Sequence, residues 1–433
     1  MRDLYAGFAK ENITPPLGTP LFGYPSYRPA KRVLDNLYIS ATAIRQGSET
    51  IILMSADLAV LDNSFCEDLY KKIEAETGVT AKNITLTCTH THSGPMTKDC
   101  PGWGEADNDY LENTLAKGAL NVAKAAVDNL TPAVVGIGQS DCYAAVNRRQ
   151  FKNGEIVLGQ NPDGPFDPKM TAIVFKTPEG KYIATVIHYA MHGTCADGHT
   201  LSITRDWPSI MVNTVEAMTN AGCMYINGAE GDIGPRLSNG LTTADESQIA
   251  VIGSIAADSA VEAINSINEF NVPEIKTLSD NVYFPNCEIM PYDELVKKLE
   301  DMGAPEEQEA NNALLYNRLL SIKDMYEKNI PFEKALEVKQ TVFAIGDLAL
   351  VPIPFEAFCN IALNLRAQSP YKETIALGMA NGQFSYLPTE DELPKGGYEV
   401  GSFYGMAVPG FVESLDKEIV KENVRLLNAL KQK

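Results

Sequence analysis

The sequence is poor in positive charge and has no paired cysteine motif. Its 433 residues hold 36 Lys and Arg against 56 Asp and Glu, a net charge of -20. Nucleic acids and anionic membrane surfaces bind proteins through basic patches, so we expect neither as a partner. The eight cysteines form no CxxC pair, which argues against a zinc ribbon and against a disulfide framework. We expect reduced, mostly buried thiols.

Long apolar runs and targeting signals are also missing. No stretch approaches the roughly 20 apolar residues of a transmembrane helix. The segment Met1–Tyr5 lacks the apolar region and cleavage site of a signal peptide. We therefore expect a cytoplasmic protein without stable membrane insertion. The sequence leaves the oligomeric state open.

Several catalytic motifs are absent as well. There is no G-x-S-x-G nucleophile elbow, no S-x-x-K pair and no P-loop lysine, which weighs against a serine acyl-enzyme and against phosphoryl transfer. The Gly-rich run 228–232 is too short for a dinucleotide fingerprint. It is either a tight turn after a strand or a loop that faces the substrate.

What is present predicts an α/β fold. Apolar runs at 51–57 and 83–89 indicate strands, separated by a helical pattern at 64–77. This order favours a mixed, largely parallel sheet flanked by helices, with functional residues at the carboxyl ends of strands. A charged helical insertion is predicted over about 290–330. Further strands are expected at 133–138, 170–176, 181–190, 223–227 and 339–351, and further helices at 109–129, 207–221, 248–267, 355–368 and 416–431.

The five histidines are concentrated in two short stretches, and the set is His90, His92, His188, His192 and His199. Residues at i and i+2 of a strand point to the same face, so His90 and His92 can converge on one site. This pattern favours a metal or acid–base role. The alternative is a pair of hydrogen-bonded structural histidines beside a Gly-Pro turn.

The second histidine stretch and the acidic residues offer further candidates. His188 and His192 have i, i+4 spacing, but the residues around them are strand formers, so we expect one on a strand and the other at its mouth. Asp57 and Glu356 each follow an apolar strand, and each is either a ligand or a supporting acid. A catalytic zinc needs three ligands and an open position, which His90, His192 and Glu356 would supply.

Seven ordered segments resemble the neutral (non-lysosomal) ceramidase family. The run Thr89-His90-Thr91-His92-Ser93-Gly94-Pro95 is similar to the zinc-binding run of that family. The other matching segments are Asn12–Pro15 with Leu21–Tyr24, Ala145–Arg149, Tyr189–Thr194 with Asp206–Pro208, Asn227–Pro235, Pro354–Glu356, and Ala380–Tyr386 with Gly397–Glu399. The resemblance covers the whole chain.

The resemblance implies one Zn²⁺ per chain and a role for each matched residue. The implied zinc ligands are His90, His192, Glu356 and Tyr386. It implies catalytic contacts to the reacting group from His92, Arg148 and Tyr398, and substrate binding by Gly23 and Arg148. His188 matches a position that is not a ligand, and His199 has no assigned role.

The sequence also departs from the family pattern. Family ceramidases are longer, end in an immunoglobulin-like domain and are usually secreted or membrane-associated, whereas nothing after Leu415 leaves room for such a domain. Gly193 replaces the proline that usually follows the second zinc histidine. We therefore expect a single catalytic domain over residues 1–433 that acts on a smaller, soluble N-acyl substrate rather than on ceramide.

The function that this resemblance implies is zinc-dependent hydrolysis of an amide bond by a metal-activated water. An esterase or lactonase using the same site is one alternative, because such a centre does not distinguish the leaving group. A non-catalytic binding protein is the other, although all four matched ligand positions are filled.

Overall fold

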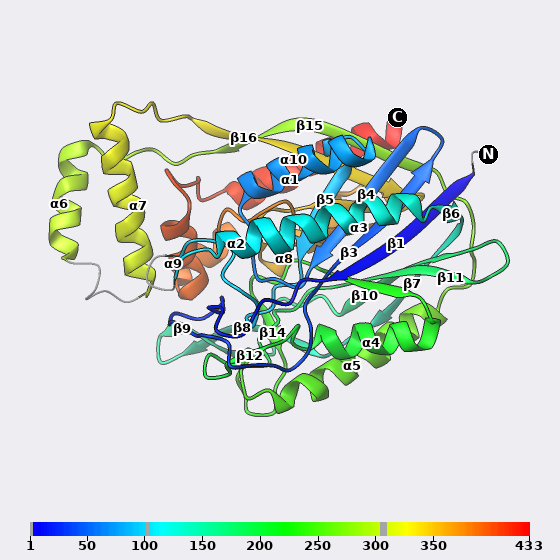
Figure 1. Cartoon of the computed structure of the whole chain (residues 1–433). Helices are drawn as coiled ribbons and strands as arrows, with labels where there is room; N and C mark the ends of the chain where they lie inside the picture. Colours follow the sequence, from blue (N-terminus) through cyan, green and yellow to red (C-terminus); the bar gives the residue numbers. More distant parts are fainter. Residues whose placement is uncertain (1–2, 101–103, 304–309) are drawn as a thin grey trace.

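Three larger sheets form the framework of the computed structural model, which describes residues 3–100, 104–303 and 310–433 (Figure 1). The first has the order β5-β4-β3-β1-β6, with β1 (Leu4–Asn12), β3 (Tyr38–Gln46), β4 (Glu49–Ala56), β5 (Ile84–Cys88) and β6 (Thr131–Pro132). The second, β13-β11-β10-β7, contains β7 (Val134–Asp141), β10 (Lys169–Lys176), β11 (Tyr182–Tyr189) and β13 (Gly222–Asn227). The third, β15-β16-β17-β19, contains β15 (Ile275–Pro285), β16 (Ala335–Ile345), β17 (Leu348–Pro352) and β19 (Glu373–Leu377).

Each sheet contains one parallel pair, and a helix connects the two strands of each pair. The units are β4–α1–β5, β11–α4–β13 and β17–α8–β19, with α1 (Asn63–Thr77), α4 (Pro208–Thr219) and α8 (Cys359–Gln368). The mixed α/β class is confirmed, but the prediction of a largely parallel sheet is wrong in that detail. Antiparallel pairs outnumber parallel ones among the described strands, in part because short turns join neighbours such as β3 to β4 and β10 to β11.

Helices cover the outer faces of the sheets, and the inner faces meet in a shared core. The first sheet is covered by α1 and by a continuous helical segment, α2 (Asn108–Tyr110) to α3 (Lys117–Asp128), close to the predicted 109–129. The second is covered by α4 and α5 (Ser247–Asn265), and the third by α8 and α10 (Leu415–Gln432). Buried side chains from all three sheets pack together, including Leu53, Val186, Met224, Leu350 and Ile375.

Two helices lie where the helical insertion is predicted. They are α6 (Tyr292–Met302) and α7 (Ala310–Glu327), and they stand at one end of the molecule in Figure 1. Leu295, Leu299, Leu319 and Ile322 form a small core between them. Helix α7 also packs against α9 (Tyr398–Met406), and Arg318 donates hydrogen bonds to the carbonyl oxygens of Tyr404 and Pro409.

One predicted helix begins later than expected. The pattern predicts a helix from Phe355, but α8 begins at Cys359 because Glu356 and Ala357 form the short strand β18 (Glu356–Ala357). This strand pairs in parallel with β20 (Tyr386–Leu387). The remaining elements are β2 (Arg32–Val33), β8 (Ala145–Lys152), β9 (Glu155–Asn161), β12 (Ser202–Ile203), β14 (Ile233–Pro235), and two 3₁₀ helices at Ala81–Asn83 and Glu390–Lys395.

The thiols and the most apolar helix bear on the class of the protein. All eight cysteines are free and six are buried, as expected. Among the described residues, α5 alone has the length and composition to cross a membrane. Half of that apolar stretch is buried in the fold, where it packs against α4, β7 and β10.

Candidate active site

The segments that follow the parallel strands are joined to one another by backbone hydrogen bonds. After β5, His92 N–H donates to Gly193 O, in the segment that follows β11. Gly228 N–H, after β13, donates to Tyr189 O at the end of β11, and Gly378 N–H, after β19, donates to Asn227 O. The carboxyl ends of four strands therefore meet, as the α/β order predicts.

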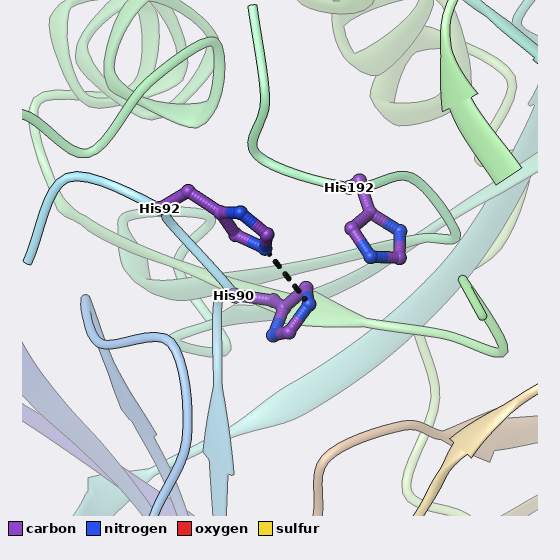
Figure 2. A group of neighbouring side chains, drawn as sticks. All are labelled: His90, His92 and His192. Atoms are coloured by element: carbon purple, nitrogen blue, oxygen red, sulfur yellow. Dashed lines mark hydrogen bonds between the residues drawn. The ribbon is translucent and has the colours of Figure 1, made fainter. Parts of the chain in front are cut away.

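His90 and His92 converge, but a backbone turn rather than strand alternation brings them together. Strand β5 ends at Cys88, and His90 has a φ of 64°, in the left-handed region. The two ring centroids lie 4.9 Å apart, and the centroid of His192 lies 4.6 Å from that of His90 (Figure 2). A non-glycine residue in this conformation is strained, which is a frequent feature of functional sites.

Backbone carbonyls hold the rings of His90 and His192 in one tautomer. The Nδ1 of His90 donates to Ala59 O at 2.8 Å, and the Nδ1 of His192 donates to Glu230 O at 2.8 Å. A proton on Nδ1 leaves Nε2 as the acceptor. Both rings therefore present a lone pair to the same space, with the supporting hydrogen bonds that metal-binding histidines require.

Glu356 and Tyr386 complete this set of donors, because they are direct partners in the β18–β20 pair. The Oε2 of Glu356 lies 3.2 Å from His90 Nε2 and 3.4 Å from His192 Nε2, and Tyr386 Oη lies 3.5 Å from His192 Nε2. Ligand bonds of about 2.1 Å place tetrahedral donors about 3.4 Å apart. These three separations are close to that value, as expected for donors that could share one divalent cation.

Electrostatics support the same interpretation. Burial, together with the nearby charges of Arg148 and His90, lowers the pKa of His192 to about 3. Burial opposes protonation of His90, yet the adjacent Glu356 carboxylate raises its pKa. Burial likewise opposes ionisation of Glu356, but His90 and His192 hold the pKa of that carboxyl well below its usual range. The Oε2 of Glu356 has no hydrogen-bond partner in the described residues, so its charge is available to a cation.

His92 differs from the other two histidines. It belongs with His90 and His192 to one group of potential metal ligands, whose ring nitrogens lie within 4.8 Å of one another, but it is less buried than the other two. Its Nε2 lies 3.3 Å from His90 Nε2, and burial together with the neighbouring imidazoles lowers its pKa well below the usual value. Gly23 packs directly on the ring, where a Cβ would lie 2.4 Å from Cγ of His92. Only glycine fits there, so Gly23 lies directly against His92, and its role in substrate binding stays a prediction.

Arg148 and Tyr398 border the same space. Arg148 donates from Nη2 to Tyr386 Oη at 3.1 Å and from Nε to Glu399 at 2.8 Å. The rings of Tyr398 and Tyr386 have centroids 5.7 Å apart. Burial raises the pKa values of both tyrosine hydroxyls, and the Glu356 carboxylate adds to each shift. Both hydroxyls are therefore protonated near neutral pH unless a cation acts on them.

Three other candidates lie outside this cluster. His188 lies on β11, where its Nε2 bonds Ala376 O at 3.0 Å and burial lowers its pKa to about 4. His199 is exposed. Asp57 accepts a hydrogen bond from Tyr38 N–H at 2.8 Å, which joins the end of β4 to the start of β3.

Sequence reasoning assigned no role to three residues that contact the cluster. Gln383 donates to Glu356 Oε1 at 2.7 Å, and Glu399 binds Arg148. Glu230 belongs to a second group of potential metal ligands, with His90 and Glu356. Each of the three lies beside or within a segment quoted for the family resemblance, and that proximity was the available signal.

Comparisons with known proteins bear on the family and the fold of the chain. The sequence profile of neutral/alkaline non-lysosomal ceramidase, N-terminal, matches residues 5–266. The fold is similar to that of the neutral ceramidase from Pseudomonas aeruginosa, with a TM-score of 0.78 and 18% identity over 100% of this chain and 75% of that one. It is also similar to a ceramidase complexed with C2, with a TM-score of 0.76 and 17% identity over 100% and 76%.

No curated protein sequence matches the chain. The two solved structures, at these low identities, establish the fold. The profile match establishes the family, because residues 5–266 make up more than half of the 433 residues. The chain is a hydrolase that belongs to the neutral/alkaline non-lysosomal ceramidase family.

Proposed function

We propose that the protein is a zinc-dependent hydrolase that cleaves the amide bond of a small, soluble N-acyl compound, with water as the nucleophile. One observation carries this proposal. Glu356 Oε2 lies 3.2 Å from His90 Nε2 and 3.4 Å from His192 Nε2, and Tyr386 Oη lies 3.5 Å from His192 Nε2. Two imidazoles and two oxygen donors at these separations form a site that suits zinc.

The metal would be held by His90, His192, Glu356 and Tyr386. Zinc, when bound, supplies a Lewis acid that lowers the pKa of water and polarises a carbonyl oxygen. Arg148 donates a hydrogen bond to the Tyr386 oxygen, and this favours the electron-rich form that a ligand needs. Gln383 holds Oε1 of Glu356, which leaves Oε2 directed at the two histidines.

His92 is suited to moving the proton. Its lowered pKa keeps the imidazole neutral but weakly basic, so it would accept a proton only from water that the cation makes more acidic. The imidazolium formed in this way then donates the proton to the departing amine nitrogen as the C–N bond breaks. His92 is less buried than His90 and His192, which supports a place for it on the side where a substrate would approach.

Tyr398 and Arg148 complete the proposed machinery. Because the Tyr398 hydroxyl keeps its proton, it can donate a hydrogen bond to the oxyanion that develops on the carbonyl oxygen. Arg148 stays charged and is held by Glu399, so it can orient a polar or anionic part of the substrate. Gly23 lets the backbone approach the His92 ring closely, which narrows the space beside it.

Two observations support the substrate class. Membership of a ceramidase family supports an amide bond. The net charge of -20 supports a substrate in solution rather than one held at an anionic membrane surface. We also propose a cytoplasmic location, which the eight free thiols support because they suit a reducing compartment.

Metal analysis and a substrate series would test the proposal. Purified protein is analysed for bound metals and then assayed on N-acyl amines from acetyl to palmitoyl, beside esters with the same acyl groups. We expect about one zinc per chain, loss of activity on chelation, and preference for amides with short acyl groups. Preference for the matched esters would favour an esterase, and full activity in metal-free protein would contradict the proposal.

Ligand variants provide the second test. His90→Ala and Glu356→Ala should each lose metal and activity together. We expect a loss above the 100-fold range typical of residues that only support ligands. His199→Ala is the matched control, because His199 is exposed and outside the cluster. It should keep both metal and activity.

A further inference from the structure

Glu230 is a buried acid without a hydrogen-bond donor from any other described residue. It lies in the loop between β13 and β14, and its side chain has no solvent exposure. Neither carboxylate oxygen has a hydrogen-bond partner among the described residues. A charged group in this position is costly unless something else compensates for it.

Gly378 lets the Glu230 carboxylate pack closely against the backbone. A Cβ on Gly378 would lie 2.4 Å from Glu230 Oε2 and 1.8 Å from Gly228 O. A Cβ on Gly231 would lie 2.4 Å from Glu356 O. The loop therefore touches both the β18 backbone and the segment after β19. Any side chain at Gly378 would displace the Glu230 carboxylate.

The side chain of Glu230 lies close to the metal-binding cluster. One of its oxygens lies within 4.8 Å of ligand atoms of both His90 and Glu356. Its backbone carbonyl oxygen accepts the hydrogen bond from Nδ1 of His192. The same residue thus orients one imidazole through its backbone and faces a second through its side chain.

Other buried acids in the chain do have protein donors. Asp232, two residues away, accepts hydrogen bonds from Cys359 N–H at 2.7 Å and from Asn147 Nδ2 at 2.9 Å. Asp206 accepts from the backbone N–H groups of Cys195, Ala196 and Trp207. Glu230 differs because its oxygens face the cluster and have no such donors.

We propose that Glu230 is a further ligand residue of the metal centre and gives it a second carboxylate beside Glu356. This inference rests on the proposed function, because it requires the divalent cation. Two carboxylates would balance the charge of that cation without ionisation of Tyr386. A set with more oxygen donors would also favour harder ions, so we expect the site to accept Mn²⁺ in addition to Zn²⁺.

The test uses Glu230→Gln, which keeps the shape and removes the charge. Zinc dissociation constants are measured by chelator competition, and the visible absorption of the Co²⁺-loaded protein is recorded, since that absorption intensifies as the coordination number falls. We expect Glu230→Gln to raise the zinc dissociation constant about 10- to 100-fold. We also expect the Co²⁺ absorption to intensify.

Asp232→Asn is the matched control, because it removes a neighbouring buried acid that has its own donors. It should leave the zinc affinity and the Co²⁺ spectrum unchanged. An unchanged affinity and spectrum in Glu230→Gln would overturn the inference. If that variant does not fold, Glu230→Asp replaces it: a weaker affinity with an altered spectrum supports the inference, and wild-type values overturn it. Failure of the wild-type protein to bind any divalent cation would instead contradict the proposed function.

Discussion

Two buried acidic clusters lie side by side in this protein, and they are stabilised differently. Glu399 is sandwiched between two guanidinium groups, with Arg148 Nε and Arg149 Nη1 each 2.8 Å from one of its oxygens. Glu356 faces two imidazoles, and its Oε2 has no hydrogen-bond partner in the described chain. The first cluster is complete within the polypeptide. The second holds side chains that could bind a metal ion.

This difference separates a positioning cluster from a binding cluster. Buried ion pairs are stable only when their hydrogen bonds are satisfied, as those of Glu399 are. Buried polar groups that lack partners occur at sites that bind ions, substrates or water. Arg148 connects the two clusters, because it binds Glu399 and also donates to Tyr386. The complete cluster thus holds a residue of the incomplete one.

The largest effect should come from His92→Gln. If His92 moves the proton and is not a ligand, the variant should lose about 10²- to 10⁴-fold in kcat. Its zinc content should stay at the wild-type level. Steady-state kinetics and metal analysis on one preparation would check both, with His199→Gln as the control. Loss of zinc in His92→Gln would make His92 part of the binding cluster instead.

Glu399→Gln should cause the largest loss of stability. It leaves two buried guanidinium groups without their shared carboxylate, so we expect unfolding to become easier by about 3–5 kcal/mol in denaturant titrations. Activity should fall about 10- to 100-fold because Arg148 is no longer held, while zinc stays bound.

Glu392→Gln is the matched control for this prediction. Glu392 accepts from Nε of Arg149, but it is partly exposed, so its loss should cost at most about 1 kcal/mol. Equal stabilities of the two variants would show that the ion pairs of Glu399 with Arg148 and Arg149 do not stabilise the fold more than a partly exposed pair does.

Much of the fold follows from sequence patterns, and the exceptions have local causes. The order of β4, α1 and β5 is readable from apolar runs, and it led to the prediction of a largely parallel sheet. The runs at β7, β10 and β11 have no helix between them, and this fact points to antiparallel pairing instead. The β18–β20 pair was not predictable in this way, because it joins residues 356–357 to residues 386–387. Two-residue strands leave no periodic pattern.

The site was predictable to a similar degree. The concentration of histidines indicates a metal or acid–base site near His90 and His192. Tyr386 came from the family resemblance alone, since the chemistry of a phenol does not suggest a ligand. The acceptors that set the histidine tautomers, Ala59 O and Glu230 O, are backbone atoms. Every residue type has a backbone carbonyl oxygen, so the sequence does not reveal which ones accept these hydrogen bonds.

Asp57 has fewer hydrogen-bond donors than Glu399, and its ionisation should make the stability of the protein depend on pH. It has one backbone donor, and burial raises its pKa to about 6, although Arg205 opposes the shift. The folded protein therefore holds this proton more tightly than the unfolded chain does. The resulting stability is present below about pH 4 and is lost as pH rises through about 6.

Asp57→Asn should remove that pH dependence. The free energy of unfolding of the variant, relative to wild type, should rise between about pH 4 and pH 7. Denaturant titrations of both proteins across this range would measure the difference, so that other titrating groups cancel. Parallel pH profiles would show that Asp57 is as well compensated as Glu399.

The smallest effect should come from an exposed pair, Lys71 and Asp68 on α1. Their charged atoms are 2.9 Å apart, and both side chains are largely exposed. Water can replace either partner, so Lys71→Ala should shift the midpoint of thermal unfolding by no more than about 1 °C. Differential scanning calorimetry beside Glu399→Gln would measure both on one scale. A shift as large as that of Glu399→Gln would mean that proximity of opposite charges, rather than burial with satisfied hydrogen bonds, explains the stability of the Glu399 cluster.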